Sequence, residues 1–155
     1  VVFNGCSKSQ AMTGLRLGYA MVPEHVISAL NRVHQYTMLS APTAGQYAGI
    51  EALKNCREDV EDMVSQYDRR RNFVLSRFSE MGIDCFEATG AFYVFPECPG
   101  EDAEQFAEDL LEAESVAMVP GNAVGAGADG HLRASYATAL DELKEAMDHL
   151  ERFLQ

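Results

Sequence analysis

The sequence of 155 residues lacks several features that define whole classes of protein. No stretch approaches the roughly 20 consecutive apolar residues that a membrane-spanning helix needs. The chain begins Val1-Val2-Phe3 without a charged and then apolar leader, so we predict no signal peptide and expect a cytoplasmic location. Its four cysteines form no C-x-x-C pair and have no histidine at ligand spacing. This pattern argues against a structural zinc site and favours reduced thiols.

Basic residues are also scarce, because 12 Lys and Arg face 24 Asp and Glu, for a formal net charge of −12. A field of this sign repels nucleic acids and anionic membranes, so neither is expected as a partner. The run Arg69-Arg70-Arg71 lies among acidic residues of a predicted helix. We therefore expect ordinary ion pairs along a helix face rather than a nucleic-acid site.

Ordinary globular usage, with 47% hydrophobic and 23% charged residues, predicts a packed core, and the apolar spacing predicts an α/β fold. Helices are predicted over residues 23–36, 43–54, 58–81, 102–114 and 141–154. Short strands are predicted over 1–3 (the tail of a buried strand), 15–22, 90–96, 116–119 and 131–136. Thr43 is expected to cap the second helix and Gly82 to end the third.

Two cationic side chains near the start of the sequence are candidates for chemistry. Lys8, one of only three lysines, directly follows the first predicted strand in a turn that also holds Ser7. Eight residues further on, Arg16 has apolar neighbours on both sides. A guanidinium fork pairs best with phosphate or carboxylate. From these residues alone, a lysine nucleophile beside an anion site, assisted by Ser7, competes with a surface lysine and an ion-paired arginine.

The segment from Gly5 to Gly18 closely resembles the pyridoxal-phosphate lysine signature of class I and II aminotransferases. Small residues precede the lysine, and Gly14-Leu15-Arg16-Leu17-Gly18 follows it at the family's spacing. The resemblance continues in the family's order through Ala41-Pro42-Thr43, Gln46-Tyr47, Gly90-Ala91-Phe92-Tyr93, Val119-Pro120-Gly121 and Leu132-Arg133-Ala134-Ser135-Tyr136-Ala137. It covers essentially the whole chain and looks most like the aspartate and aromatic aminotransferase branch.

This resemblance implies a fold type I enzyme that uses pyridoxal 5′-phosphate and transfers an amino group between an amino acid and a 2-oxo acid. It implies that Lys8 holds the cofactor covalently and then moves the proton of the substrate Cα. It implies that Arg16 binds the cofactor phosphate, with Ser7 contributing, and that Arg133 binds the substrate α-carboxylate. A structural arginine at a strand edge is the alternative for Arg133. The family further implies a homodimer. No metal site is expected from the residues.

The sequence also departs from the family pattern. Gly5 stands where many members carry a hydroxyl residue that reaches the phosphate. The family's lysine lies well past mid-chain, and its glycine-rich phosphate loop, ring-stacking aromatic residue and pyridine-nitrogen aspartate have no counterpart here. We therefore expect the C-terminal part of an aminotransferase. It would comprise a remnant of the cofactor-binding large domain (1–42), connecting helices (43–82) and a small α/β domain (83–155).

Other functions stay open at this point. Relatives of the same fold use the same lysine for decarboxylation, elimination or acyl transfer, which Arg133 does not exclude. The chain is alternatively a non-catalytic folded fragment, and in either case we expect it to be inactive alone. The G-x-G-x-x-G pattern over residues 125–130 is interpreted as a loop, because a strand rather than a helix is predicted after it. The histidines share no ligand spacing, and His131 is near the substrate only if Arg133 is.

Overall fold

The computed structural model describes residues 1–90 and 92–155, so Ala91, within the predicted strand over 90–96, lies outside the described residues. The chain forms two compact units, Val1–Met63 and Val64–Gln155. The division falls within helix α4 (Arg57–Glu80), in the segment assigned above to connecting helices. None of the helices in the described part combines the length and apolar character that a membrane crossing requires.

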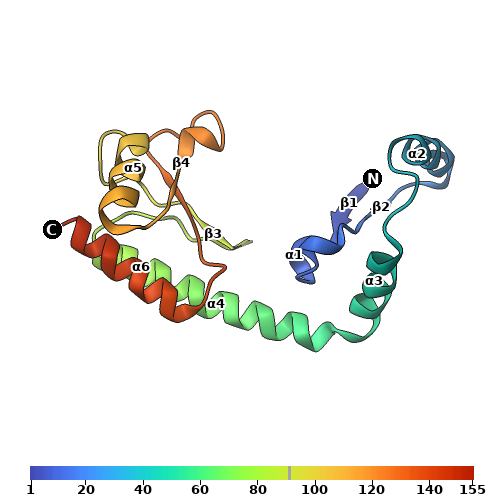
Figure 1. The fold of residues 1–155 in the computed structure, drawn as a ribbon, viewed down its shortest axis with the longest axis horizontal. Coiled ribbons are helices and arrows are strands. Elements are labelled where there is room, and N and C mark those ends of the chain that lie inside the picture. The colour runs from blue at the N-terminus through green and yellow to red at the C-terminus, as the bar shows by residue number, and fades with distance from the viewer. Residues whose placement is uncertain (91) are drawn as a thin grey trace. The chain divides into compact units, whose positions relative to one another are not determined.

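The first unit is built around a two-stranded antiparallel sheet, in which Val2 lies opposite Met21 and Gly5 lies opposite Gly18. Its elements, drawn in blue to green in Figure 1, are β1 (Val2–Gly5), α1 (Cys6–Ser9), the 3-10 turn η1 (Thr13–Leu15), β2 (Gly18–Met21), α2 (Glu24–Thr37) and α3 (Thr43–Asn55). Helix α2 begins directly after Pro23 and confirms the predicted helix there.

Three details of this unit differ from expectation. The predicted strand over 15–22 shrinks to β2, because Arg16 adopts the left-handed conformation, which breaks an extended ladder. The strand expected to be buried at the start is exposed, with Phe3 69% accessible, because among the described residues β1 pairs with β2 alone. Thr43 does not cap α3: Pro42 occupies the cap position without a side-chain bond.

The second unit contains a three-stranded antiparallel sheet in the order β3-β5-β4. Its elements after α4 are β3 (Tyr93–Val94), α5 (Ala103–Glu114), β4 (Val119–Pro120), the 3-10 turn η2 (Gly121–Ala123), β5 (Leu132–Ser135) and α6 (Leu140–Phe153). Tyr93 pairs with Ser135, and Val119 pairs with Arg133. The strands predicted over 90–96 and 131–136 are present in a shortened form, whereas the one predicted over 116–119 shares only Val119 with β4. The predicted helices are confirmed within one or two residues.

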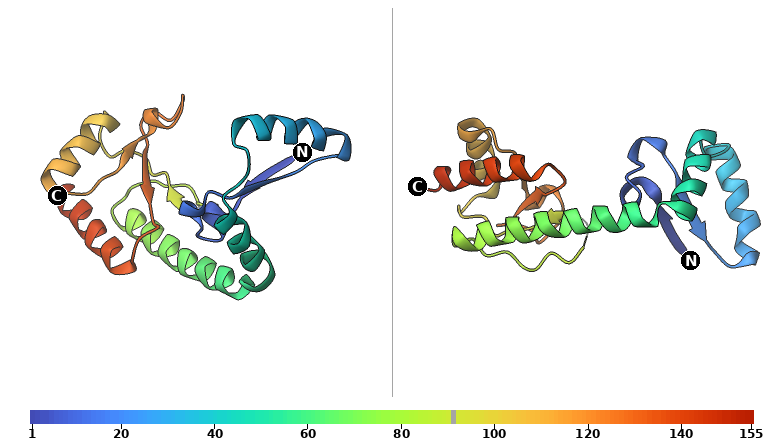
Figure 2. Two further views of the ribbon diagram at one scale, coloured as in Figure 1. Left: turned by 45° about the vertical axis from the view of Figure 1, so that its right-hand side comes forward. Right: turned by 90° about the horizontal axis from the view of Figure 1, so that it is seen from below.

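The core of the second unit lies between this sheet and the helices α4, α5 and α6. Helices α4 and α6 run side by side (Figures 1 and 2). Arg77 of α4 forms ion pairs with Asp148 and Glu151 of α6, each at 3.0 Å. The most buried side chains include Val74, Phe78, Leu110, Leu132, Tyr136 and Leu150. Gly82, at φ +72°, ends α4 as predicted, because glycine adopts this backbone conformation without strain.

Candidate functional site

Lys8 lies on α1, the single helical turn that follows β1 (Figure 1). Two buried neighbours anchor this turn: Cys6 is 0% and Met12 8% exposed. The backbone N–H of Cys6 donates to the carbonyl of Leu17 at 3.0 Å, and that of Met12 donates to the carbonyl of Cys6 at 3.2 Å. The lysine itself is exposed. The fold therefore presents its amine on a short turn whose base is held in place.

Thr13 connects Arg16 with Ser7 in the same segment. The Thr13 hydroxyl donates to the carbonyl oxygen of Ser7 at 2.9 Å, and Nη1 of Arg16 donates to the carbonyl oxygen of Thr13 at 3.4 Å. The second bond is long and uses only one of the five N–H groups of the guanidinium, so the others can bind an anion. The structure thus brings Ser7, Lys8 and Arg16 into one hydrogen-bonded segment of the first unit.

The donor set of this segment fits a phosphorylated aldehyde such as pyridoxal phosphate. A primary amine is the group that condenses with an aldehyde, and Lys8 supplies it on an exposed turn. A phosphate dianion is bound best by a guanidinium fork with further hydroxyl donors, which Arg16 and the half-buried Ser7 supply. The chemistry of these three side chains therefore matches both ends of such a molecule.

Arg133 lies in the second unit, at the centre of the sheet on β5. Its guanidinium carbon is 4.7 Å from the centre of the Tyr93 ring, within the range of a cation–π contact. A ring contact uses no N–H donor, so the fork keeps its donors for a carboxylate. The side chain is half-buried, which favours a defined orientation.

The strand that carries Arg133 is held at both ends. At its start, the N–H of Leu132 donates to the carbonyl of Pro96 at 3.0 Å, and at its end the N–H of Tyr136 donates to the carbonyl of Phe92 at 3.0 Å. His131 stacks on Phe95, with ring centres 5.2 Å apart and planes at 4°. This contact gives His131 a packing role beside the strand.

The loop before β5 corresponds to the glycine pattern over 125–130. Gly127 and Gly130 have φ values of +83° and +78°, and β5 follows. A dinucleotide site would need a helix to begin there, with its N-terminus at the pyrophosphate. The interpretation of this pattern as a loop is confirmed.

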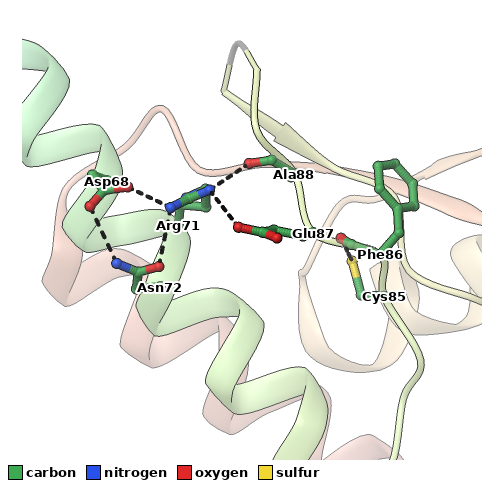
Figure 3. Close-up of polar contacts among 7 residues, drawn as sticks. All are labelled: Asp68, Arg71, Asn72, Cys85, Phe86, Glu87 and Ala88. Atoms are coloured by element: carbon green, nitrogen blue, oxygen red, sulfur yellow. Dashed lines mark hydrogen bonds and ion pairs between the residues drawn. The ribbon is translucent and has the colours of Figure 1, made fainter.

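Arg71 ties α4 to the segment that precedes β3, a contact that the sequence analysis missed (Figure 3). Its guanidinium lies 2.6 Å from a carboxylate oxygen of Asp68 and donates to the carbonyl of Ala88 at 3.1 Å. The side chain is 20% exposed. The Asp68 pair confirms the predicted helix-face pairing. No local sequence signal marks the Ala88 contact, which spans 17 residues.

The described residues contain no group of three or more His, Cys, Asp or Glu that could hold a metal ion. All four cysteines have free thiols. Burial raises the pKa of Cys85, and burial together with a hydrogen bond to Asp59 raises the pKa of Cys56. Raised thiol pKa values disfavour the reactive thiolate at these positions.

Comparison with known proteins shows which family and which solved structures the chain is similar to. A family model described as aminotransferase class I and II matches residues 1–150. Aromatic-amino-acid aminotransferase 2 of Thermococcus litoralis and an aspartate aminotransferase of Pyrococcus abyssi are each 41% identical over 159 residues, covering 100% of this chain and 41% of their own length. The crystal structure of an aspartate aminotransferase from Thermotoga maritima matches with a TM-score of 0.89 and 40% identity, over 98% of this chain and 39% of that one. The chain thus spans about 40% of the length of these relatives.

Proposed function

Because the chain belongs to the class I and II aminotransferase family, with a mixed α/β fold of type I, we propose that it contributes to a pyridoxal-phosphate-dependent aminotransferase site. The reaction moves an amino group between an amino acid and a 2-oxo acid. One observation carries the proposal: Lys8 follows β1 directly, and Arg16 is linked back to Ser7 through Thr13. This segment offers an amine and a phosphate-binding fork within one short stretch of chain.

Each candidate side chain has a distinct task in this reaction. When bound, the cofactor would withdraw electrons from the bond that breaks at the substrate Cα. Lys8 Nζ would hold the cofactor, and it would take up and return the Cα proton. Arg16 and Ser7 hold the phosphate. Arg133 donates two parallel hydrogen bonds to the α-carboxylate of the substrate and so orients the Cα–H bond.

The proposal extends to a homodimer of the parent enzyme, located in the cytoplasm. The first unit exposes large apolar side chains, among them Tyr36 at 88% and Leu39 at 81%. Large exposed apolar surfaces are typical of sites where another protein surface packs. The free thiols suit a reducing compartment. The chain is expected to self-associate, and a monomeric mass by light scattering at all concentrations would count against this self-association.

Titration of the chain with pyridoxal phosphate tests the proposed site. The absorbance change that accompanies condensation of the aldehyde with an amine should saturate, and inorganic phosphate should compete. Lys8→Arg should abolish this change, whereas the matched control Lys54→Arg should retain it. Arg16→Ala should raise the dissociation constant about tenfold or more, because it removes charge-assisted hydrogen bonds to the phosphate. Equal titration of the Lys8→Arg and Lys54→Arg variants would overturn the proposal.

A further inference from the structure

Arg16 has an unusual backbone conformation for a residue with a side chain. Its φ and ψ are 52° and 47°, the left-handed region in which the Cβ atom crowds the following carbonyl oxygen. A residue keeps such a conformation only where its surroundings fix it, and such residues gather at functional sites. The contacts made by the two residues on either side, Leu15 and Leu17, therefore explain the backbone conformation of Arg16.

Helix α3 holds both of these neighbours. A Cβ atom at Gly45 would lie 2.6 Å from the carbonyl oxygen of Leu15, and one at Gly49 would lie 2.3 Å from Cδ2 of Leu17. Gly45 and Gly49 are buried and one helical turn apart, so they lie on one face of α3. The Leu15 backbone and the Leu17 side chain therefore rest directly on the helix backbone, in space that any larger residue would fill.

Leu17 is also fixed from the other side. Its carbonyl accepts the hydrogen bond from the N–H of Cys6, the buried residue at the start of α1. The contact with α3 therefore sets the position of the chain that follows Arg16 relative to the turn that carries Lys8. The backbone on both sides of Arg16 is constrained, and the left-handed conformation is the local result.

We propose that Leu17, seated on α3 at Gly49, is a positioning residue that holds Arg16 in the left-handed conformation in which its guanidinium binds the cofactor phosphate. This inference rests on the proposed function, because it gives Arg16 the phosphate as its ligand. Loss of the Leu17 contact leaves Arg16 free to relax to an ordinary backbone conformation. The chain then loses phosphate affinity without losing the amine of Lys8.

The experiment compares pyridoxal phosphate with pyridoxal, which lacks the phosphate. The ratio of their dissociation constants for the whole chain measures what the phosphate contributes. Leu17→Ala and Gly49→Ala should each reduce this ratio about tenfold, the effect of losing a charge-assisted contact, while pyridoxal affinity stays within twofold. Leu17→Met should keep the wild-type ratio of the two dissociation constants, since methionine has about the same side-chain volume as leucine. Gly14→Ala is the matched control, because a Cβ atom there meets nothing within 4 Å.

A second readout follows the conformation directly. A positive φ at Arg16 gives a strong NMR cross-peak between its amide and Hα protons, which should weaken in Leu17→Ala and Gly49→Ala and persist in Gly14→Ala. Equal weakening of pyridoxal and pyridoxal phosphate binding would overturn the proposal, because it would reveal a merely structural role. Retention of the cross-peak in both variants would also overturn it. A wild-type chain without any phosphate contribution would instead refute the phosphate role in the proposed function, while the cross-peak still decides whether Leu17 positions Arg16.

Discussion

Replacement of Gly121 with alanine should destabilise the second unit at the loop that leads to Arg133. A Cβ atom at this position would lie 1.9 Å from the carbonyl oxygen of Ala128, 2.9 Å from its carbonyl carbon and 3.0 Å from the carbonyl oxygen of His131. All three atoms belong to the backbone, so no side-chain rotation relieves the overlap. The loop between η2 and β5 must move away from η2.

This movement breaks the hydrogen bond that closes the loop. The N–H of Gly121 donates to the carbonyl of His131 at 2.8 Å. Overpacking at a buried site costs about 1–3 kcal/mol, and the lost hydrogen bond adds about 1 kcal/mol. We therefore expect a loss of about 2–4 kcal/mol in the free energy of unfolding of this unit.

Urea unfolding followed by circular dichroism measures this loss, and amide exchange of Leu132 assigns it to the strand. Gly125→Ala is the matched control, because a Cβ atom there has nothing within 4 Å and its effect should stay within about 0.5 kcal/mol. The Leu132 amide, which donates to the carbonyl of Pro96, should exchange faster in Gly121→Ala alone. Equal stability of the two variants would refute the steric reasoning.

Three further predictions concern other contacts of the chain. Arg71→Ala should lower the stability of the second unit by about 2 kcal/mol, since it removes the charged donor to the Ala88 carbonyl; an unchanged urea midpoint would contradict this. A hydrogen bond from Arg152 lowers the pKa of Glu114, so this carboxylate stabilises the fold above its ordinary pKa of 4.5 and loses that effect as the pH falls through the lowered value. The stabilities of wild type and Glu114→Gln should therefore converge as the pH falls from about 5 to 2, and parallel curves would exclude the effect. The chain alone should not convert 2-oxoglutarate in the presence of amino acids, because it spans about 40% of its relatives; conversion that disappears in Lys8→Ala would prove otherwise.

The helices were predictable because their signals are local. Apolar spacing and the terminal Gly82 placed the longest helix at 58–81, one residue from α4 at each end. The start of α3 was less well predicted, because Thr43 lies inside the helix rather than before it. There Gln46 Nε2 donates to the carbonyl of Ala41 at 2.8 Å, which ties the helix to the preceding loop. A contact of this kind has no simple sequence signature.

The strands depended on partners that the sequence does not reveal. Residues 15–22 have the composition of a strand, yet the packing of Leu17 on Gly49 places Arg16 in the left-handed region and delays β2 to Gly18. The spacing of Gly45 and Gly49 indicates a close approach to α3, but only the fold identifies the segment that approaches. Tertiary contact therefore overrides the local preference for an extended chain.

The residues alone pointed to Lys8, Arg16 and Ser7 as candidates, whereas the cofactor, the role of each residue and the choice of Arg133 came from the family resemblance. The structure adds what the motif cannot contain: the Thr13 bridge between Ser7 and Arg16, and the Tyr93 ring beside Arg133. Both contacts depend on backbone geometry across turns or between strands. Motif spacing records which residues are present, whereas their orientation follows from packing around them.

Reduction of a mixture of the chain and pyridoxal phosphate with borohydride, followed by digestion and mass spectrometry, identifies the lysine that condenses with the aldehyde. The chain has three lysines, and Lys144, whose amine lies 3.1 Å from a carboxylate oxygen of Asp141, serves with Lys54 as an internal control. We expect a pyridoxyl label on Lys8 that inorganic phosphate and Arg16→Ala both diminish. Weak and equal labelling of all three lysines would contradict this expectation.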